Sequence, residues 1–146
     1  MPSPFPHRYD VQLVAKDGRS VLSGGGRRPE IVGGAPPEFD GSDEWWSPEH
    51  LLLASASLCL TTTFEAFARR ARLAVDGFEC RAHGVLEKTA GGLAFTSIRL
   101  AVDLRVAEAD RARAEQLLES AKKHCIVANA LKPAVELEIL VAAAAG

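Results

Sequence analysis

The stretch that decides the fold is residues 47–73, SPEHLLLASASLCLTTTFEAFARRARL. Ser47 is a favoured N-cap residue, and Pro48 follows at the first helical position, where its missing N–H costs nothing. Since neither glycine nor a further proline interrupts the segment, the sequence predicts one long helix over residues 47–73. Its first half is apolar all round, which is the pattern of a helix buried from every direction.

One face of this helix carries mostly small side chains, which lets another backbone approach closely. The residues on this face are Leu52, Ser55, Ala56, Cys59, Thr63 and Ala66. In a chain of 146 residues we expect the approaching backbone to belong to a second subunit. The longest apolar run without charge, residues 51–64, is shorter than the roughly 18 residues of a membrane span, so no membrane partner is expected.

Before the helix, residues 1–46 are predicted to form a hairpin and loops. Residues 9–15 alternate as a strand does, and Asp17-Gly18 is a turn dipeptide that sends the chain back through residues 20–22. A glycine- and proline-rich stretch follows, with one short strand expected near residues 30–32. This part is too small to fold alone, so no domain boundary is predicted.

After the helix, the pattern changes to a period of two, and residues 75–106 are predicted to form a β-hairpin that turns at Ala90-Gly91-Gly92. The residues expected on the inner face of its second strand are Ala94, Thr96, Ile98, Leu100, Val102 and Leu104. A second helix region is expected over residues 109–131, with an inward stripe that continues to Cys125, and a final strand over residues 134–142. The prediction is one α+β domain over residues 1–146.

The composition excludes several functional classes. With 47% hydrophobic residues, 25% charged residues and a net charge of −2, the chain has the composition of a soluble globular protein with no nucleic-acid partner. Residues 1–10, MPSPFPHRYD, have no signal-peptide pattern, so we expect a cytoplasmic protein. The common hydrolase and nucleotide-binding motifs are absent, and the four histidines show no metal-ligand spacing, so no metal is expected.

The three cysteines are an odd number at wide spacing, which argues against a disulfide framework and against a zinc site. Each is first interpreted as a small core residue, and for Cys80, on the apolar face of a strand, that interpretation suffices. Cys125 follows Lys122-Lys123-His124, and nearby positive charge lowers the pKa of a thiol. For Cys59 or Cys125 taken alone, a small core residue is still the leading interpretation, and the basic run before Cys125 favours a larger thiolate fraction there.

Two stretches resemble the paired cysteine motifs of the OsmC/Ohr family, which comprises osmotically inducible protein C and the organic hydroperoxide resistance proteins. The first is Ser47-Pro48-Glu49-His50-Leu51 followed by Cys59, ten residues after the Glu, and the second is the CIVANAL run of residues 125–131. The length of the chain and the order of its elements fit the family over nearly all residues. The resemblance implies an OsmC-like α+β fold, with antiparallel sheets around a long central helix and an intertwined homodimer with its active sites between subunits.

The resemblance also implies a thiol-dependent peroxidase. Cys59 would attack the O–O bond of an organic or fatty-acid hydroperoxide and become a sulfenic acid, and Cys125 would condense with it to a disulfide. An external dithiol, in the family a lipoyl group or a small thiol, would reduce the disulfide. No resident cofactor such as flavin, haem or metal is implied.

The family pairs its reactive cysteine with an arginine. In the OsmC branch this arginine precedes an aromatic-acid-Gly triplet, and here the triplet at residues 39–41 is preceded by Glu38 instead. In the Ohr branch it comes from the first hairpin turn, which makes Arg19 the expected residue. The alternatives are Lys16, Arg27 and Arg28.

Glu49 lies ten residues before Cys59 on the predicted helix, a distance of about 15 Å, so it cannot touch the Cys59 of its own chain. It belongs to the site only across a dimer. The alternative interpretation is an acid that the helix dipole favours in the first turn.

A second function is weighed beside the peroxidase. The missing arginine, with Trp45 and Trp46 as an apolar lip, is compatible with a non-catalytic OsmC-like module that binds an acyl-like or aromatic small molecule in the intersubunit cleft. The second motif also has Ile126 and Ala128 where the family usually has Pro and Ser. A structural dimer with incidental cysteines is the third interpretation.

Overall fold

The computed structural model describes residues 3–143, so the first two residues of the N-terminal stretch and the last three residues of the chain lie outside it. The chain divides into two compact units, Met1–Leu51 and Leu52–Gly146. The prediction of a single domain therefore stays a prediction.

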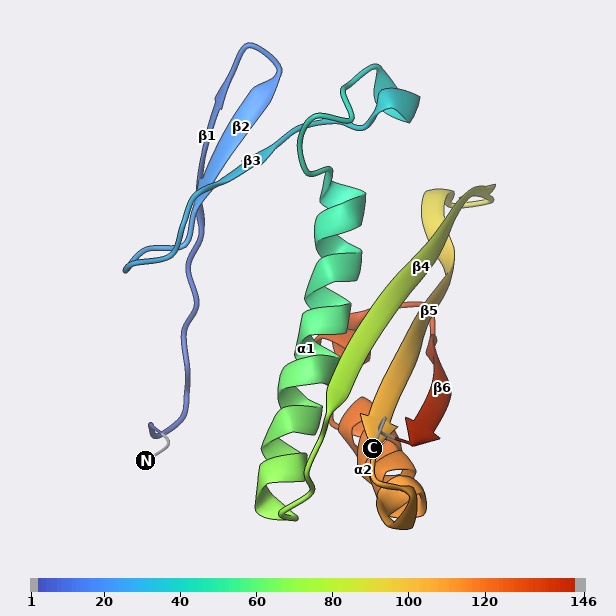
Figure 1. Cartoon of the computed structure of the whole chain (residues 1–146). Helices are drawn as coiled ribbons and strands as arrows, with labels where there is room; N and C mark the ends of the chain where they lie inside the picture. The colour runs from blue at the N-terminus through green and yellow to red at the C-terminus, as the bar shows by residue number, and fades with distance from the viewer. Residues whose placement is uncertain (1–2, 144–146) are drawn as a thin grey trace. The chain divides into compact units, whose positions relative to one another are not determined.

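The strands and helices, labelled in Figure 1, are β1 (Gln12–Lys16), β2 (Arg19–Ser23), β3 (Ile31–Gly33), α1 (Pro48–Arg70), β4 (Gly77–Thr89), β5 (Gly92–Val106), α2 (Arg111–Lys123), α3 (Ile126–Ala130) and β6 (Val135–Ala143), with short 3₁₀ turns at Pro37–Phe39 and Glu108–Asp110.

The first unit is built on a three-stranded antiparallel sheet in the order β1-β2-β3. Asp17 and Gly18 have φ angles of 56° and 77°, which is the left-handed pair that a two-residue hairpin turn needs. The hairpin that the Asp-Gly dipeptide predicts is therefore confirmed. The short strand expected near residues 30–32 is confirmed as β3.

The start of α1 follows the prediction. Ser47 is almost fully buried, and its Oγ accepts the backbone N–H of His50 at 3.1 Å. The Oγ atom also lies 2.6 Å from Nδ1 of His50. Ser47 thus satisfies one of the free N–H groups in the first turn, as an N-cap residue does.

The end of α1 lies at Arg70, three residues before the predicted end at residue 73. Arg72 adopts a left-handed conformation with φ of 54°. The N–H of Arg72 then bonds to the carbonyl of Arg69 at 3.1 Å, and that of the buried Leu73 bonds to the carbonyl of Ala68 at 2.9 Å. This is a Schellman motif with arginine in the place of the usual glycine, which is why the sequence shows no stop signal.

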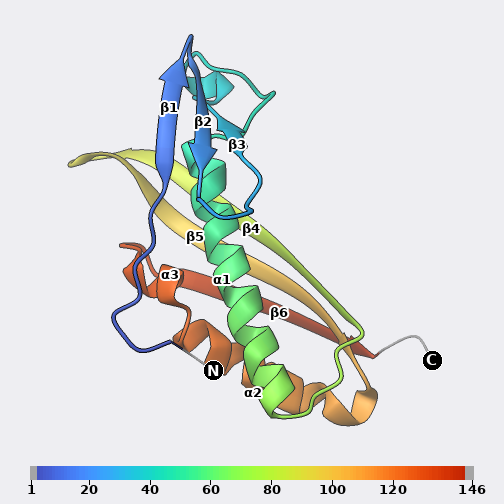
Figure 2. The same cartoon turned by 90° about the vertical axis from the view of Figure 1, so that its left-hand side faces the viewer.

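The second unit is built on a sheet in the order β4-β5-β6, in which β4 and β5 are antiparallel and β5 and β6 are parallel. The expectation of antiparallel sheets is therefore wrong for β6, because the connection from β5 through α2 and α3 is long enough for a crossover that returns the chain in the same direction. Helices α1 and α2 lie on the same face of this sheet (Figure 2). Their buried side chains form one cluster with the apolar side chains of the strands. The fully buried members of the core are Ala56, Leu60, Ile98, Leu100, Leu104, Val106, Ala114, Leu118, Ala121 and Cys125. The other face carries charged side chains.

The inner face of β5 departs from the prediction at one point. The pairing of β4 with β5 shifts by one residue, so Thr96 has no partner on β4, and Phe95 rather than Thr96 packs against the core. The Thr96 hydroxyl bonds to the Glu87 carboxylate instead. The expectation that Ala94 and Thr96 face inward is therefore wrong, because a β-bulge inverts the alternation beyond it.

Helix α1 is not buried from every direction in a single chain. Its buried residues form one stripe, Ala56, Leu60, Phe64 and Ala68, and Leu58 is 63% exposed. The expectation of all-round burial is wrong for one chain, since the sheet covers a single face. The mean hydropathy of α1 is 1.5 over an 18-residue window, so the helix is long and apolar enough to cross a membrane by length and composition alone. The core helices of soluble proteins also meet this criterion.

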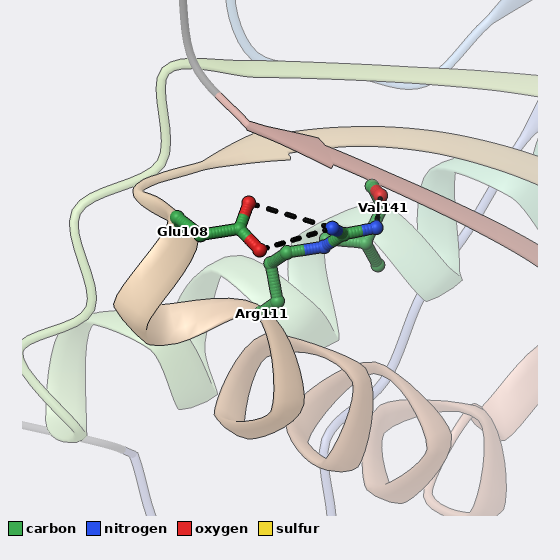
Figure 3. Close-up of polar contacts among 3 residues, drawn as sticks. All are labelled: Glu108, Arg111 and Val141. Atoms are coloured by element: carbon green, nitrogen blue, oxygen red, sulfur yellow. Dashed lines mark hydrogen bonds and ion pairs between the residues drawn. The ribbon is translucent and has the colours of Figure 1, made fainter.

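The second helix region is two helices and not one. Helix α2 ends at Lys123, and Cys125 occupies the N-cap position of the short α3 with an extended backbone, φ −71° and ψ 107°. At the other end of α2, the guanidinium of Arg111 donates to the carbonyl of Val141 at 2.8 Å and pairs with Glu108 at 3.2 Å (Figure 3). Arg111 thereby ties the start of α2 to β6.

Candidate active site

Two cysteines that are 66 residues apart in the sequence meet inside the second unit. Cys59 lies in the middle of α1, packs against the core cluster that contains Cys125, and is one of the groups that shift the pKa of the Cys125 thiol. The Sγ atom of Cys125 also lies 4.0 Å from the carbonyl oxygen of Ala56, one turn before Cys59. The structure therefore brings together the two cysteines that the sequence motifs single out.

Small residues make this approach feasible. Ala56 lies three positions before Cys59 on α1, so the two side chains share a face of the helix. Ala121 on α2 and Ala128 on α3 are both buried in the same core cluster as Cys125. Because none of these alanines extends beyond Cβ, the backbone around Cys125 can lie close to α1.

Burial dominates the electrostatics of Cys125. It raises the pKa of the Cys125 thiol, and the hydrogen bond and negative charge of Cys59 raise this pKa further. The backbone N–H groups of Ala128 and Val127 act in the opposite direction, because they stabilise the thiolate.

The expectation that Lys122, Lys123 and His124 lower the pKa of Cys125 is wrong. Its pKa is raised, and none of these side chains contributes to the shift. The ring of His124 is engaged elsewhere: Nδ1 lies 2.8 Å from the carbonyl of Ser120, and the ring packs edge-on against Phe67. Adjacency in sequence does not bring these charges to the thiol because the chain turns between α2 and α3.

Two threonine hydroxyls next to Cys59 form hydrogen bonds with the helix backbone. Thr62 and Thr63 both donate to the backbone carbonyl of Cys59, at 3.2 Å and 2.8 Å. Sequence reasoning placed Thr63 on the small face of the helix but did not foresee this role. Back-bonding to the preceding turn is common for threonine within helices, so the TTT run at residues 61–63 is the signal that indicates it.

Glu49 lies in the first turn of α1. Its Oε2 atom is buried and has no hydrogen-bond partner among residues 3–143, and the same is true of Nε1 of Trp45. A buried carboxylate oxygen without a donor is costly, so the helix dipole alone does not satisfy Glu49.

The basic candidates lie in the first unit. Arg19 opens β2, is exposed, and faces Lys16 across the hairpin. Arg27 is also exposed, whereas the guanidinium of Arg28 donates to the carbonyls of its own loop, Gly25 at 3.3 Å and Gly24 at 3.5 Å. Because Cys59 and Cys125 belong to the other unit, the roles of Arg19 and of its alternatives at the thiols stay predictions.

Cys80 lies on the inner face of β4, opposite Val102, and is partly buried. Burial raises its pKa. This environment fits a small core residue. Within residues 3–143, no group of three or more histidine, cysteine, aspartate or glutamate side chains is arranged to hold a metal ion.

Comparison with known proteins identifies the family. The family model described as OsmC-like protein matches residues 41–140. The chain belongs to the OsmC-like protein family. Its sequence is 29% identical over 108 residues to the uncharacterized protein YmaD of Bacillus subtilis (strain 168), covering 71% of this chain and 72% of that protein. The resemblance stated from the two cysteine motifs is thus confirmed.

Solved structures of this family share the fold. The OsmC-like protein VCA0330 of Vibrio cholerae has a TM-score of 0.83 at 19% identity, covering 92% of this chain and 100% of that one. An organic hydroperoxide resistance protein of Elizabethkingia anophelis has a TM-score of 0.76 at 17% identity, with 97% and 99% covered. The organic hydroperoxide resistance protein OhrB of Bacillus subtilis has a TM-score of 0.67 at 18% identity, with 93% and 98% covered. The chain therefore has the OsmC-like α+β fold, with two small sheets and helices.

Proposed function

We propose that this OsmC-like protein is a thiol-dependent peroxidase that reduces organic or fatty-acid hydroperoxides. The observation that carries the proposal is that Cys59 and Cys125 meet in one core, where Sγ of Cys125 lies 4.0 Å from the carbonyl oxygen of Ala56, one turn before Cys59. A thiol that forms a sulfenic acid needs a second thiol within reach to convert that acid into a disulfide before it is oxidised further. Membership of a family that includes organic hydroperoxide resistance proteins supports the same chemistry.

The first step is a displacement at oxygen. The Cys59 thiolate attacks the O–O bond of the hydroperoxide, an S–O bond forms, and the alkoxide leaves and takes up a proton to become the alcohol. Cys59 is suited to this role because it is the partly exposed member of the pair. Cys59 thereby becomes a sulfenic acid.

The second step joins the two sulfurs. The Cys125 sulfur attacks the sulfenic sulfur of Cys59, the S–S bond forms, and the sulfenic oxygen leaves as water with the proton of Cys125. Burial, followed by the neighbouring Cys59, raises the pKa of Cys125, which disfavours Cys125 as the thiolate that attacks the peroxide first. The partial exposure of Cys59 favours it as the first nucleophile and Cys125 as the thiol that resolves it.

Glu49 and Arg19 complete the proposed site. The buried Oε2 of Glu49 calls for a hydrogen-bond donor, and a guanidinium supplies several in one plane. We assign that donor to Arg19, with Lys16 and Arg27 as alternatives. Since Glu49 reaches a Cys59 only across a dimer, a guanidinium held in this way would stabilise the Cys59 thiolate of the second copy of the chain and orient the hydroperoxide there.

The proposed active unit is a homodimer. Two adjacent residues of β1, Leu13 and Val14, are 54% and 60% exposed. Since neighbouring residues in a strand point to opposite faces of the sheet, the first sheet exposes an apolar side chain on each of its two faces. On α1, Leu58 is 63% exposed. Exposed apolar surface of this kind on a sheet and on a helix is typical of a protein–protein interface, and the partner that we propose is a second copy of the chain.

The proposed cycle needs no resident cofactor. An external dithiol, such as a lipoyl group or a small dithiol, reduces the disulfide, and such reductants fit the cytoplasmic location that we expect. Neither nucleic acid nor a membrane takes part in this proposal.

The experiment combines thiol counting with peroxide consumption. Reduced protein is mixed with cumene hydroperoxide or a fatty-acid hydroperoxide, and we expect two thiols to be lost per turnover in the absence of reductant. Cys59→Ser should abolish consumption, whereas the matched control Cys80→Ser should retain it. Retention of all thiols under excess oxidant would refute the peroxidase.

A second candidate function is favoured by one observation. A cavity of about 450 Å³ in the first unit is lined in part by Trp45, Trp46, Pro36 and Pro37. The two tryptophans and two prolines offer apolar surface to an acyl-like or aromatic ligand in a non-catalytic module, while the acidic Glu38, Asp43 and Glu44 line the same cavity. A ligand retained in native mass spectra, together with thiols that do not react with hydroperoxide, would establish this function in place of the peroxidase.

A further inference from the structure

The two thiols of the candidate site differ in exposure. Cys125 has no exposed surface, whereas Cys59 is partly exposed. A second subunit or any other partner only covers additional surface, so association does not expose Cys125 in this conformation. Cys125 therefore stays buried in a dimer as well as in a single chain.

This difference decides where a disulfide between the two cysteines can be opened. Thiol–disulfide exchange is a displacement in which a thiolate attacks one sulfur of the bond and the other sulfur leaves, and access to the attacked sulfur is one of the factors that set its rate. Cys125 is fully buried in the same core cluster as Ala121 and Ala128, so an external thiol does not reach it without local opening. Cys59 lies at the margin of this cluster and keeps part of its surface exposed.

We infer that an external dithiol opens the Cys59–Cys125 disulfide by attacking Sγ of Cys59, and that Cys125 is the sulfur released. This inference rests on the proposed function, since it takes the disulfide as the oxidised form of the enzyme. It deepens that function by assigning the two cysteines different roles in the reductive half of the cycle.

The step is balanced as follows. A bond forms between one sulfur of the dithiol and Sγ of Cys59, the bond between Cys59 and Cys125 breaks, and its electron pair leaves on Cys125, which takes up the proton that the attacking thiol lost. The second thiol of the reductant then attacks the first sulfur of the same reductant, which closes a cyclic disulfide and releases Cys59 as a thiolate or thiol. In total, two electrons and two protons pass from the dithiol to the two cysteines.

The surroundings of Cys125 suit a leaving sulfur. When it is a thiolate, hydrogen bonding to the backbone of Ala128 and Val127 stabilises it, which lowers the pKa of Cys125 against the effect of burial. When it is a thiol, the carbonyl of Ala56 is placed to accept its S–H at 4.0 Å. Cys125 therefore has partners in both protonation states, and it stays in the core while the reductant occupies Cys59.

The decisive experiment maps a trapped mixed disulfide. The Cys80→Ser protein, which keeps only the two site cysteines, is oxidised with diamide, treated briefly with 2-mercaptoethanol and quenched with N-ethylmaleimide. A monothiol cannot cyclise, so its adduct persists for peptide mass spectrometry. We expect mercaptoethanol on Cys59 and maleimide on Cys125, and an adduct mainly on Cys125 would overturn the inference.

A second measurement needs no disulfide. In the Cys80→Ser background, Cys125→Ala leaves Cys59 as the single thiol and Cys59→Ser leaves Cys125. We expect Ellman's reagent to react with Cys59 at least about tenfold faster than with Cys125, because the buried thiol reacts only on local opening. Circular dichroism verifies that both variants are folded, and equal rates in folded proteins would also overturn the inference.

Failure of this inference and failure of the peroxidase give different results. If hydroperoxide is not consumed but diamide-oxidised protein gives the adduct on Cys59, the peroxidase is refuted and the order of attack stands. If hydroperoxide is consumed and the adduct forms on Cys125, the peroxidase stands and the order of attack is refuted.

Discussion

The two compact units bury their side chains to very different extents. In Leu52–Gly146, α1, α2 and the β4-β5-β6 sheet share one core of fully buried aliphatic side chains. In Met1–Leu51, the buried residues among those described are Gly33, Pro36 and Ser47, and no large aliphatic or aromatic side chain is buried. The comparison teaches that the thiol pair belongs to a unit with its own core, whereas the described residues of the unit that holds the β1-β2-β3 sheet bury no large apolar side chain.

The largest expected effect tests the core side of this comparison. Phe64 is 1% exposed on α1 and stacks against Phe78 of β4 at 5.5 Å between ring centroids. Phe64→Ala should lower the free energy of unfolding by about 3–5 kcal/mol, because it removes a buried ring and leaves a cavity. Urea unfolding followed by circular dichroism measures this loss.

The matched variant in the first unit is Leu13→Ala, at a residue that is 54% exposed on β1. At protein concentrations where the chain is monomeric, we expect a change within about 0.5 kcal/mol, as for an ordinary surface position. A loss comparable to that of Phe64→Ala would show that the first sheet has a core of its own and would break the comparison.

The next prediction concerns the association constant of the proposed homodimer. Leu58 on α1 and Leu140 on β6 are almost equally exposed, at 63% and 62%. Leu140 lies on the charged face of its sheet, whereas Leu58 lies on the apolar helix. In a symmetric dimer each substitution counts twice, so Leu58→Asp should weaken association by roughly 3 kcal/mol or more, about a hundredfold or more in Kd.

Sedimentation equilibrium over a range of concentrations checks this prediction. Leu140→Asp is the control and should leave the association constant unchanged. If the wild-type chain sediments as a monomer at all concentrations, or if the two variants behave alike, the homodimer through α1 is refuted.

The sequence was sufficient for features that local chemistry determines. Asp17-Gly18 indicates the hairpin and Ser47-Pro48 the start of α1, since each pattern satisfies a backbone requirement within a few residues. The pairing of Cys59 with Cys125 was available only through the resemblance to a known family. No local rule connects two residues whose contact depends on how α1 packs against α2 and α3.

The features that the sequence did not reveal arise from packing. Arg72 ends α1 in a left-handed conformation because Leu73 is drawn into the core, and no glycine marks the position. The basic run before Cys125 suggested a lowered pKa, but burial of the thiol raises it. In each case a long-range contact outweighs the local preference.

A smaller effect tests the β-bulge that places Phe95. A Cβ atom at Gly84 would lie 2.7 Å from the Phe95 ring and 3.1 Å from the side chain of Leu53. Gly84→Ala should therefore lower the free energy of unfolding by about 1–3 kcal/mol, as overpacking does. The double variant with Phe95→Leu should recover part of that loss in urea unfolding, and an additive double variant would show that the ring is not what Gly84 accommodates.

The pH dependence of disulfide closure gives the last and smallest test, and it asks whether burial or neighbouring charge controls the second unit's thiols. The attacking form of Cys125 is the thiolate, and because the pKa of Cys125 is raised, its thiolate fraction is still increasing when an ordinary cysteine is already ionised. The rate of closure after a hydroperoxide pulse should therefore rise about tenfold per pH unit below this pKa, and it should continue to rise beyond pH ~8.5, the usual value for cysteine. Acid quenching at successive times, with mass spectrometry of the sulfenic acid and the disulfide, measures the rate.

The control is Lys122→Gln, which should leave the pH–rate profile unchanged because Lys122 does not contribute to the pKa shift of Cys125. A rate that levels off below pH ~8, or a profile that moves upward in Lys122→Gln, would mean that the basic run sets the reactivity of Cys125 after all.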